Sequence, residues 1–195
     1  MITIGVTGGI GSGKSVVCDI LRLHGIPVYE ADREAKELND TSPVIRAEIT
    51  RHFGEELYRD GKLDRKAFAS VIFHDKQKLA LANAIIHPEL AKHFLLWCNR
   101  QQHPIVAIDA ALLFEAGFHS WINKVIMVYA PEDVRLKRTI VRDQATADQV
   151  KARMQAQLPE EEKIKQSDFV VYNDNAHSLI LQVEEIMKQL EIEFI

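Results

Sequence analysis

The sequence has little cysteine and no long apolar run. Only two of its 195 residues are cysteine, Cys18 and Cys98, and no C-x-x-C pair is present. This usage excludes a disulfide framework and a cysteine metal site, and we expect both side chains to fill core positions on helices. No apolar stretch approaches the roughly 18 residues of a membrane-spanning helix. Because the chain also starts directly with a strand-like segment rather than a leader, we expect a cytoplasmic protein without a membrane partner.

An excess of positive charge is also absent. The 24 Lys and Arg residues are outnumbered by 28 Asp and Glu residues, which gives a formal net charge of −4. The overall balance therefore does not indicate a nucleic-acid partner, and local cationic side chains must bind any anionic substrate. Hydrophobic residues make up 47% of the chain, as in ordinary globular domains, and the length suffices for one substantial core. No unexplained apolar surface stripe is present, so we expect a monomer.

The most informative segment is a glycine-rich stretch, residues 8–15, that follows an apolar run over residues 2–6. Its sequence, GGIGSGKS, fits the G-x-x-x-x-G-K-[ST] pattern of a phosphate-binding loop between a strand and a helix. Glycine lets backbone N–H groups surround an anion, and the next helix directs its positive end at the same charge. Lys14 can reach the β- and γ-phosphates, and the Ser15 hydroxyl can coordinate Mg²⁺. A glycine-rich turn that binds nothing rarely has this spacing, so the loop predicts a nucleoside triphosphate site.

Apolar runs and helical patterns alternate around this loop. The expected strands cover residues 2–6, 26–29, 105–108, 124–129 and 169–172. The expected helices cover residues 14–24, 131–142, 145–157, 159–166 and 177–190, and Gly25 is a stop signal for the first of them. This order predicts an α/β fold with a doubly wound, five-stranded parallel sheet.

The long middle segment, residues 33–103, contains no convincing strand. The expected helices there cover residues 33–38, 43–53, 65–73, 76–86 and 88–102, with breaks at Thr41-Ser42-Pro43, Asp60-Gly61 and His87-Pro88. So long a helical excursion exceeds what one crossover requires. It predicts a separate helical lobe that binds the second substrate.

Polar residues at the strand ends narrow the class of nucleotide-dependent protein. The late strand over 169–172 is followed by Asn-Asp-Asn rather than by the Asn-Lys-x-Asp of a GTPase, and Asp109 is followed by Ala110 rather than by a second acid. What remains is similar to a small-molecule kinase. Asp32 follows the second strand, at the edge where the phosphate loop lies, and is suited to accept a hydroxyl proton. Capping the next helix is the other role for Asp32, and the two are compatible.

For two further groups of polar residues, the sequence is compatible with more than one role. Asp109 either binds a water molecule of the Mg²⁺ shell, orients a substrate group or is a simple cap. Arg135, Arg138 and Arg142 lie on one stripe of a helix. We favour phosphate contact for Arg138 and Arg142 and a solvated position for Arg135.

His87, Lys62 and Arg65 fall within the expected helical lobe. His87 either contacts the substrate or only starts a helix. Lys62 and Arg65 either meet an anionic substrate or are solvated.

Taken in order, the motifs of this chain resemble those of the dephospho-CoA kinase family. They cover residues 7–15, 30–32, 60–65, 86–88, 112–115, 136–138, 142–143 and 167–173, with intervening spacing that also matches. The resemblance implies transfer of the ATP γ-phosphoryl group to the ribose 3′-hydroxyl of 3′-dephospho-CoA, with Mg²⁺, to give CoA and ADP in the last step of coenzyme A biosynthesis. A related kinase for a nucleoside, nucleotide or small polyol is the alternative, followed by a regulatory module that hydrolyses ATP slowly.

The resemblance also implies roles for individual residues. Asp32 is the implied base, and Lys14 and Arg138 are implied to contact the transferring phosphate. The expected Mg²⁺ ligand is Ser15, and Asp109 is a candidate that acts through water. The implied ATP-binding residues are Gly9, Gly11, Ser12, Gly13, Lys14, Ser15, Val16, Arg142 and Asn173. The implied acceptor-binding residues are Thr7, Asp32, Lys62, Arg65, His87, Leu113, Phe114 and Glu115.

The implied organisation is a single kinase domain over residues 1–195. Its core covers residues 1–32, 104–135 and 167–195, the substrate lobe about 33–103, and a mobile helical lid about 136–166. Three positions depart from the usual family pattern: Glu30 stands in place of Asp, Ala111 in place of Pro, and Val16 in place of Thr. None of these removes a residue to which the resemblance gives a chemical role.

Overall fold

The computed structural model describes residues 1–72 and 75–193, with side chains through Leu190. Contacts divide the chain into two compact units: unit 1 comprises Met1–Tyr29 and Gln101–Ile195, and unit 2 comprises Glu30–Arg100. Each unit has its own apolar core. Within the described residues, no helix is both long enough and apolar enough to cross a membrane.

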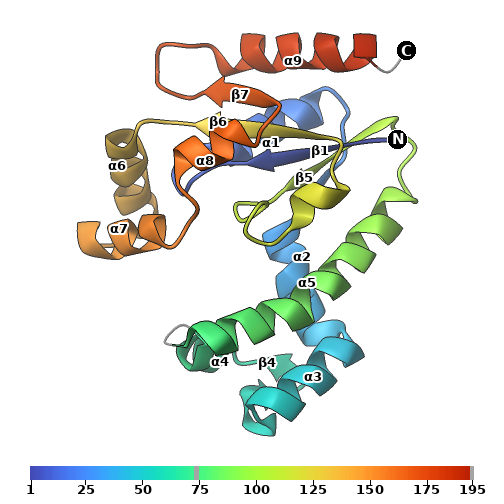
Figure 1. The fold of residues 1–195 in the computed structure, drawn as a ribbon, viewed down its shortest axis with the longest axis vertical. Helices are drawn as coiled ribbons and strands as arrows, with labels where there is room; N and C mark the ends of the chain where they lie inside the picture. The colour runs from blue at the N-terminus through green and yellow to red at the C-terminus, as the bar shows by residue number, and fades with distance from the viewer. Residues whose placement is uncertain (73–74, 194–195) are drawn as a thin grey trace. The chain divides into compact units, whose positions relative to one another are not determined.

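A five-stranded sheet with the strand order β2-β5-β1-β6-β7 forms the centre of unit 1 (Figure 1). The strands are β1 (Ile2–Thr7), β2 (Val28–Glu30), β5 (Ile105–Asp109), β6 (Lys124–Tyr129) and β7 (Phe169–Tyr172). Strand β1 pairs in parallel with β5 and β6, and β6 pairs in parallel with β7. The predicted doubly wound parallel sheet is therefore confirmed.

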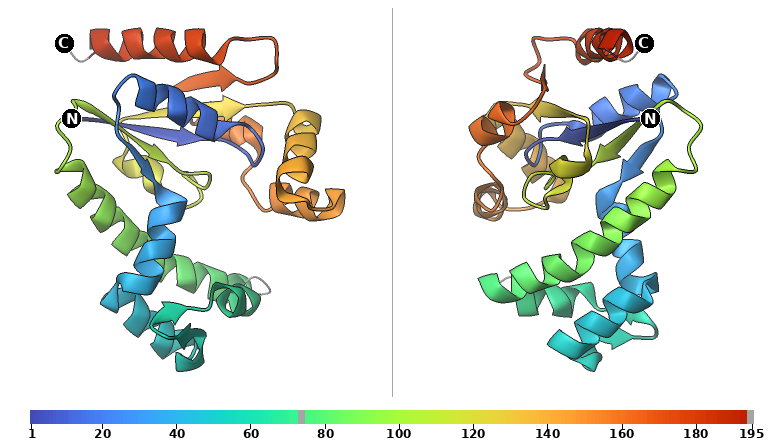
Figure 2. Two further views of the ribbon diagram at one scale, coloured as in Figure 1. Left: turned by 180° about the vertical axis from the view of Figure 1, so that it is seen from behind. Right: turned by 45° about the vertical axis from the view of Figure 1, so that its right-hand side comes forward.

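The helices of unit 1 lie on both faces of this sheet and beyond its carboxyl edge (Figure 1). They are α1 (Lys14–Leu23), α6 (Glu132–Asp143), α7 (Ala147–Gln155), α8 (Glu160–Lys165) and α9 (Leu179–Glu193), with a 3₁₀ segment, η2, over Phe118–Trp121. Helices α1 and α9 share one core with the sheet, in which Val17 and Leu190 are fully buried beside Ile4. Figure 2 shows α8 on the face opposite α1. Cys18 is buried on α1, as predicted.

The parallel pairing sets the position of the functional loops. Strands β1, β5, β6 and β7 run in one direction, so the segments that follow them meet at a single edge of the sheet. These segments start at Gly8, Ala110, Ala130 and Asn173. They include the phosphate loop and most of the predicted ATP-binding residues.

Unit 2 is mainly helical, with α2 (Ala31–Thr41), α3 (Pro43–Phe53), α4 (Arg65–Ile72) and α5 (Lys76–Cys98) around a short 3₁₀ segment, η1 (Glu55–Leu57). Ile45 and Ile49 of α3 are fully buried in its core. The predicted break before α3 is confirmed, since Ser42 Oγ accepts a hydrogen bond from Ile45 N at 3.3 Å. The expected helix over 65–73 matches α4 up to Ile72, whereas Phe73 lies outside the described residues.

Two predictions for this segment are wrong. A small antiparallel hairpin, β3 (Tyr58–Arg59) and β4 (Lys62–Leu63), lies where no strand was expected. Its turn places both Asp60 and Gly61 at positive φ, 49° and 81°, and two-residue strands carry almost no periodicity to detect.

The expected break at His87-Pro88 is also absent from the described α5, which continues through Pro88. Proline removes a single N–H donor, and α5 buries Ala82 before it and Phe94 after it, so packing on both sides outweighs the local cost. Cys98, the last residue of α5, is buried as predicted.

Candidate active site

The phosphate loop joins β1 to α1 and is bent by its own hydrogen bonds. Ser12 N donates to Gly9 O at 3.0 Å, and Val16 N donates to Gly13 O at 3.0 Å. Gly13 has φ +89°, and a Cβ atom there would overlap the side-chain amide of Asn173. Only glycine combines this left-handed backbone with so close a neighbour, which explains its place in the motif.

Three amide groups of the loop form the candidate anion site. Among the described residues, no acceptor binds the N–H groups of Gly11, Gly13 and Ser15. Gly13 directly precedes α1, a helix of 10 residues, and Ser15 lies in its first turn, so these donors add to the positive end of the helix dipole. This arrangement suits the phosphate groups of a nucleotide.

The ammonium group of Lys14 forms an ion pair with the carboxylate of Asp109. Lys14 is the first residue of α1, and Asp109 is the last residue of β5, where it lies opposite Val6 of β1. The alternative in which Asp109 is a simple cap is wrong, because the next helical element in the described chain is η2, which starts at Phe118. The hydroxyl of Ser15 and the carboxylate of Asp109 are hard oxygen donors, and this chemistry fits Mg²⁺.

Arg138 and Asn173 are two other predicted site residues that lie beside the same loop. Asn173 directly follows β7, and its Nδ2 atom donates to Ser12 O at 2.7 Å. Arg138, on α6, donates to Asn173 O at 3.3 Å and to Asn175 Oδ1 at 3.0 Å. A guanidinium group is thus held beside the phosphate loop by acceptors at the end of β7.

The other two arginines of α6 have different surroundings. Arg142 binds Asp143 through both carboxylate oxygens, at 2.7 and 3.1 Å. The hydrogen bonds from Arg142 and then Arg153 hold the pKa of Asp143 well below its usual range. The expectation that Arg135 is solvated is wrong, because it is only 7% exposed. Its Nε atom donates to Ala130 O at 3.1 Å, and its backbone carbonyl lies against Gly11, so this stripe of α6 faces the loop.

The predicted acceptor loop around Glu115 is anchored by the buried Lys163. The Nζ atom of Lys163 lies 3.1 Å from Ala111 O and 3.0 Å from Glu115 Oε1, and the Glu115 oxygen also accepts from Leu158 N at 2.8 Å. Thr7 Oγ1 donates to Ala111 O at 3.4 Å. Leu113 is fully buried and Phe114 is 8% exposed, so these side chains support the loop from the core.

The remaining predicted residues lie in unit 2. Asp32 is exposed in the first turn of α2, two residues after β2, and Glu30 occupies the N-cap position, so the alternative of Asp32 as the cap is wrong. Arg65 is tied to Asp40 Oδ2 at 2.5 Å, and Lys62 is exposed on β4. His87 lies in the middle of α5, where burial lowers the pKa of its imidazole.

The family model described as dephospho-CoA kinase matches residues 2–178 of this chain. The chain belongs to the dephospho-CoA kinase family. Dephospho-CoA kinases of Porphyromonas gingivalis and Bacteroides fragilis are 45% and 40% identical to it, and the matches cover 96% and 95% of this chain and 94% and 91% of theirs. A crystal structure from Thermus thermophilus superposes with a TM-score of 0.84 at 35% identity, covering 100% of this chain and 98% of that one. The predicted resemblance is confirmed, and family membership makes this chain an ATP-dependent kinase.

Sequence reasoning missed three residues of this dephospho-CoA kinase family member: Gln157, Glu160 and Lys163. Gln157 and Glu160 contact the phosphate loop from 147 and 151 positions away in the sequence. No local pattern connects residues at such a separation. The only signal nearby is Pro159, which marks the start of α8 and indicates nothing about the loop.

Proposed function

We propose that this chain transfers the γ-phosphoryl group of ATP to the ribose 3′-hydroxyl of 3′-dephospho-CoA, giving ADP and CoA. The observation that carries the proposal is the family match over residues 2–178 together with a phosphate loop whose lysine pairs with Asp109. The relatives from Bacteroides fragilis and Porphyromonas gingivalis are dephospho-CoA kinases, and they match nearly all of this chain.

On the donor side, Lys14 and Arg138 bind the transferring phosphate. The charge of that group spreads over its outer oxygens in the transition state, which suits an ammonium and a guanidinium held in place beforehand. The N–H groups of Gly11, Gly13 and Ser15 bind the phosphate that stays with ADP. Val16, Arg142 and Asn173 complete the proposed ATP site.

On the acceptor side, Asp32 takes the proton of the 3′-hydroxyl as its oxygen bonds to the γ-phosphorus. The bond from that phosphorus to the β–γ bridging oxygen breaks, and the oxygen leaves as part of ADP. The proposed acceptor site is made by Thr7, Lys62, Arg65, His87, Leu113, Phe114 and Glu115. Glu30–Arg100 form a compact unit of their own, which supports the proposal that residues 33–103 are a separate substrate lobe.

Mg²⁺ belongs to the same proposal. Ser15 and, through water, Asp109 are the residues that would hold it. When bound, the ion supplies positive charge that offsets the charge of the phosphate oxygens. We further propose that residues 136–166 form a lid. We also propose that the protein is a cytoplasmic monomer with neither a nucleic-acid nor a membrane partner.

An acceptor panel tests the proposed function. ADP release from Mg·ATP is measured with dephospho-CoA, adenosine, AMP, shikimate and no acceptor. We expect dephospho-CoA to be the one acceptor in this panel that raises ADP release above the control without acceptor. Release with another acceptor, and only background with dephospho-CoA, would overturn the assignment while leaving the nucleotide site intact.

A further inference from the structure

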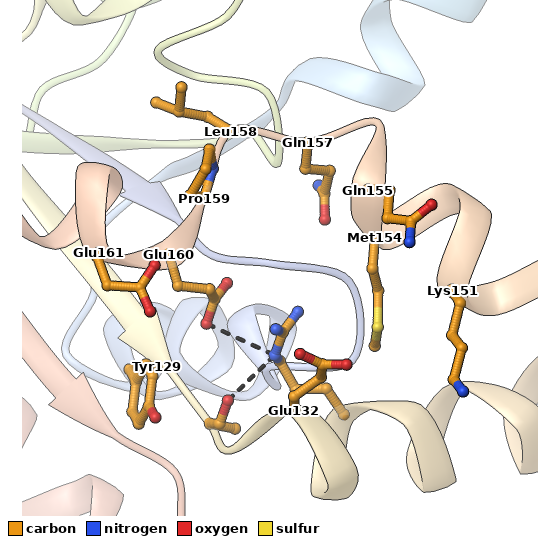
Figure 3. A pocket seen from close by; sticks show the side chains of 12 residues that line it. Tyr129, Glu132, Lys151, Met154, Gln155, Gln157, Leu158, Pro159, Glu160 and Glu161 are labelled. Atoms are coloured by element: carbon orange, nitrogen blue, oxygen red, sulfur yellow. Dashed lines mark hydrogen bonds and ion pairs between the residues drawn. The ribbon is translucent and has the colours of Figure 1, made fainter.

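Gln157, between α7 and α8, and Glu160, the first residue of α8, contact the start of the phosphate loop. Gln157 Oε1 accepts a hydrogen bond from Ile10 N at 2.9 Å, and Glu160 Oε1 accepts one from Gly9 N at 3.1 Å. In Figure 3 both side chains point into a pocket of about 600 Å³. All of these residues lie in unit 1.

Glu160 is itself held in place by Arg135. Arg135 Nε lies 3.5 Å from Glu160 Oε2, and the side chains of Arg135 and Glu160 are only 8% and 14% exposed. Burial raises the pKa of the Glu160 carboxyl, while Arg135 and the Gly9 N–H act in the opposite direction. A buried carboxylate is costly unless it is paired, so Arg135 and the Gly9 N–H together stabilise Glu160 against the loop.

The loop amides therefore fall into two groups. Those of Gly9 and Ile10 are bound by side chains of the protein. Those of Gly11, Gly13 and Ser15 have no acceptor among the described residues and form the candidate anion site. A Cβ atom added at Gly9 would overlap Glu160 Oε1 and Arg135 Nη1, so the first half of the loop is covered by protein.

We propose that Gln157 and Glu160 are positioning residues that hold the first half of the phosphate loop, so that its second half keeps the geometry that binds ATP. The inference rests on the proposed function only for its nucleotide site. Without the two acceptors, the Gly9 and Ile10 amides lose their partners and the loop samples other conformations. Only the fraction in the binding geometry then takes up nucleotide, which weakens the apparent affinity.

Affinity for the nonhydrolysable analogue Mg·AMP-PNP, measured by calorimetry without an acceptor, tests this inference. Gln157→Leu and Glu160→Leu should each raise the dissociation constant by about tenfold. Gln157→Glu and Glu160→Gln keep an acceptor oxygen and should stay within about threefold of the wild type. The matched controls are Gln155→Leu, at the exposed end of α7, and Glu161→Leu, at an exposed position near the start of α8, and they should bind as the wild type does.

Several outcomes overturn the proposal. Unchanged affinity in both leucine variants would mean that the contacts do not position the loop. Tighter binding would mean that the two side chains compete with nucleotide. Equal losses in the leucine and acceptor-keeping variants would mean that the hydrogen bonds are not responsible. If the wild type binds no nucleotide, the proposed function itself fails, whereas normal wild-type binding with unaffected variants removes only this inference.

The variants that keep an acceptor oxygen distinguish a loss of loop positioning from a loss of folding. The melting temperature is measured for every variant, and Gln157→Glu and Glu160→Gln carry the test if a leucine variant does not fold. The Michaelis constant for dephospho-CoA gives a further readout. It should stay unchanged while that for ATP rises, because the contacts lie on the donor loop.

Discussion

The ammonium group of Lys14 and the carboxylate of Asp109 form an ion pair at the carboxyl edge of the sheet. The parallel pairing of β1 with β5 places Asp109 opposite Val6, beside the strand that leads into the phosphate loop. Both side chains are largely buried, at 16% and 15% exposed, so the pair is held close to the anion site. Lys14 is thus positioned for phosphate before nucleotide binds.

Replacing Lys14 with alanine should remove most of the turnover. The variant loses the cation that stabilises the transferring phosphate, so we expect kcat/KM to fall by about 10²- to 10³-fold. Steady-state ADP release measures this effect. Lys165→Ala is the matched control, since Lys165 is exposed on α8 and pairs with the exposed Glu162, and it should retain wild-type rates. A Lys14→Ala variant with near-normal kcat/KM would contradict the proposed role.

Asp32→Asn should separate chemistry from nucleotide binding. The amide cannot accept the hydroxyl proton, so kcat should fall by about 10²- to 10⁴-fold, while the affinity for Mg·AMP-PNP stays close to that of the wild type. Single-turnover rates and calorimetry give the two quantities. If Asp32→Asn kept wild-type turnover, Asp32 would not be the base.

His87 should make folding stability depend on pH near neutrality. Burial lowers the pKa of His87 in the folded chain below its ordinary value of 6.5. Below about pH 6.5 the unfolded chain therefore binds more protons at this group, so the free energy of unfolding decreases as the pH falls. His87→Leu removes this contribution and should lose less stability than the wild type between pH 8 and pH 5, roughly the range that spans the titration of histidine. Equal losses in denaturant titrations of the two proteins would contradict this prediction.

Lys163→Met should destabilise the protein. The substitution keeps the length of the side chain but leaves Glu115 and the carbonyl of Ala111 without a buried cation. Removing one partner of a buried pair costs about 3–5 kcal/mol, and Glu115 is 22% exposed, so we expect the lower end of this range. The control is Lys165→Met on the same helix, which should change the free energy of unfolding by less than about 0.5 kcal/mol. Similar stabilities for the two variants would contradict the prediction.

Local signals predicted the parts of the fold that carry them. Strands β6 and β7 and helix α3 match the expected ranges residue for residue, because apolar runs or a Ser-Pro start mark their bounds. The phosphate loop and the five-stranded parallel sheet around it were predicted for the same reason. The break expected at Pro88 failed because the packing of α5 on both sides outweighs a local preference.

Contacts between distant segments could not be predicted in this way. Arg135 looked solvated because its neighbours on the α6 stripe are polar, yet α6 turns it toward Glu160. Glu160 and Gln157 reach the phosphate loop through the packing of α7 and α8, which no residue pattern near Gly9 indicates. The proposed phosphate-binding residues were therefore predicted from a motif, while those that contact and support them required the folded structure.

The central claim is that this chain phosphorylates the 3′-hydroxyl of dephospho-CoA. Its most direct test is a reaction with Mg·ATP in which ADP and the acceptor product are measured together and the product is compared with authentic CoA by chromatography and mass. We predict one CoA for each ADP and, without dephospho-CoA, only background ADP. ADP formation that is independent of dephospho-CoA, or a product that differs from CoA, would contradict the account.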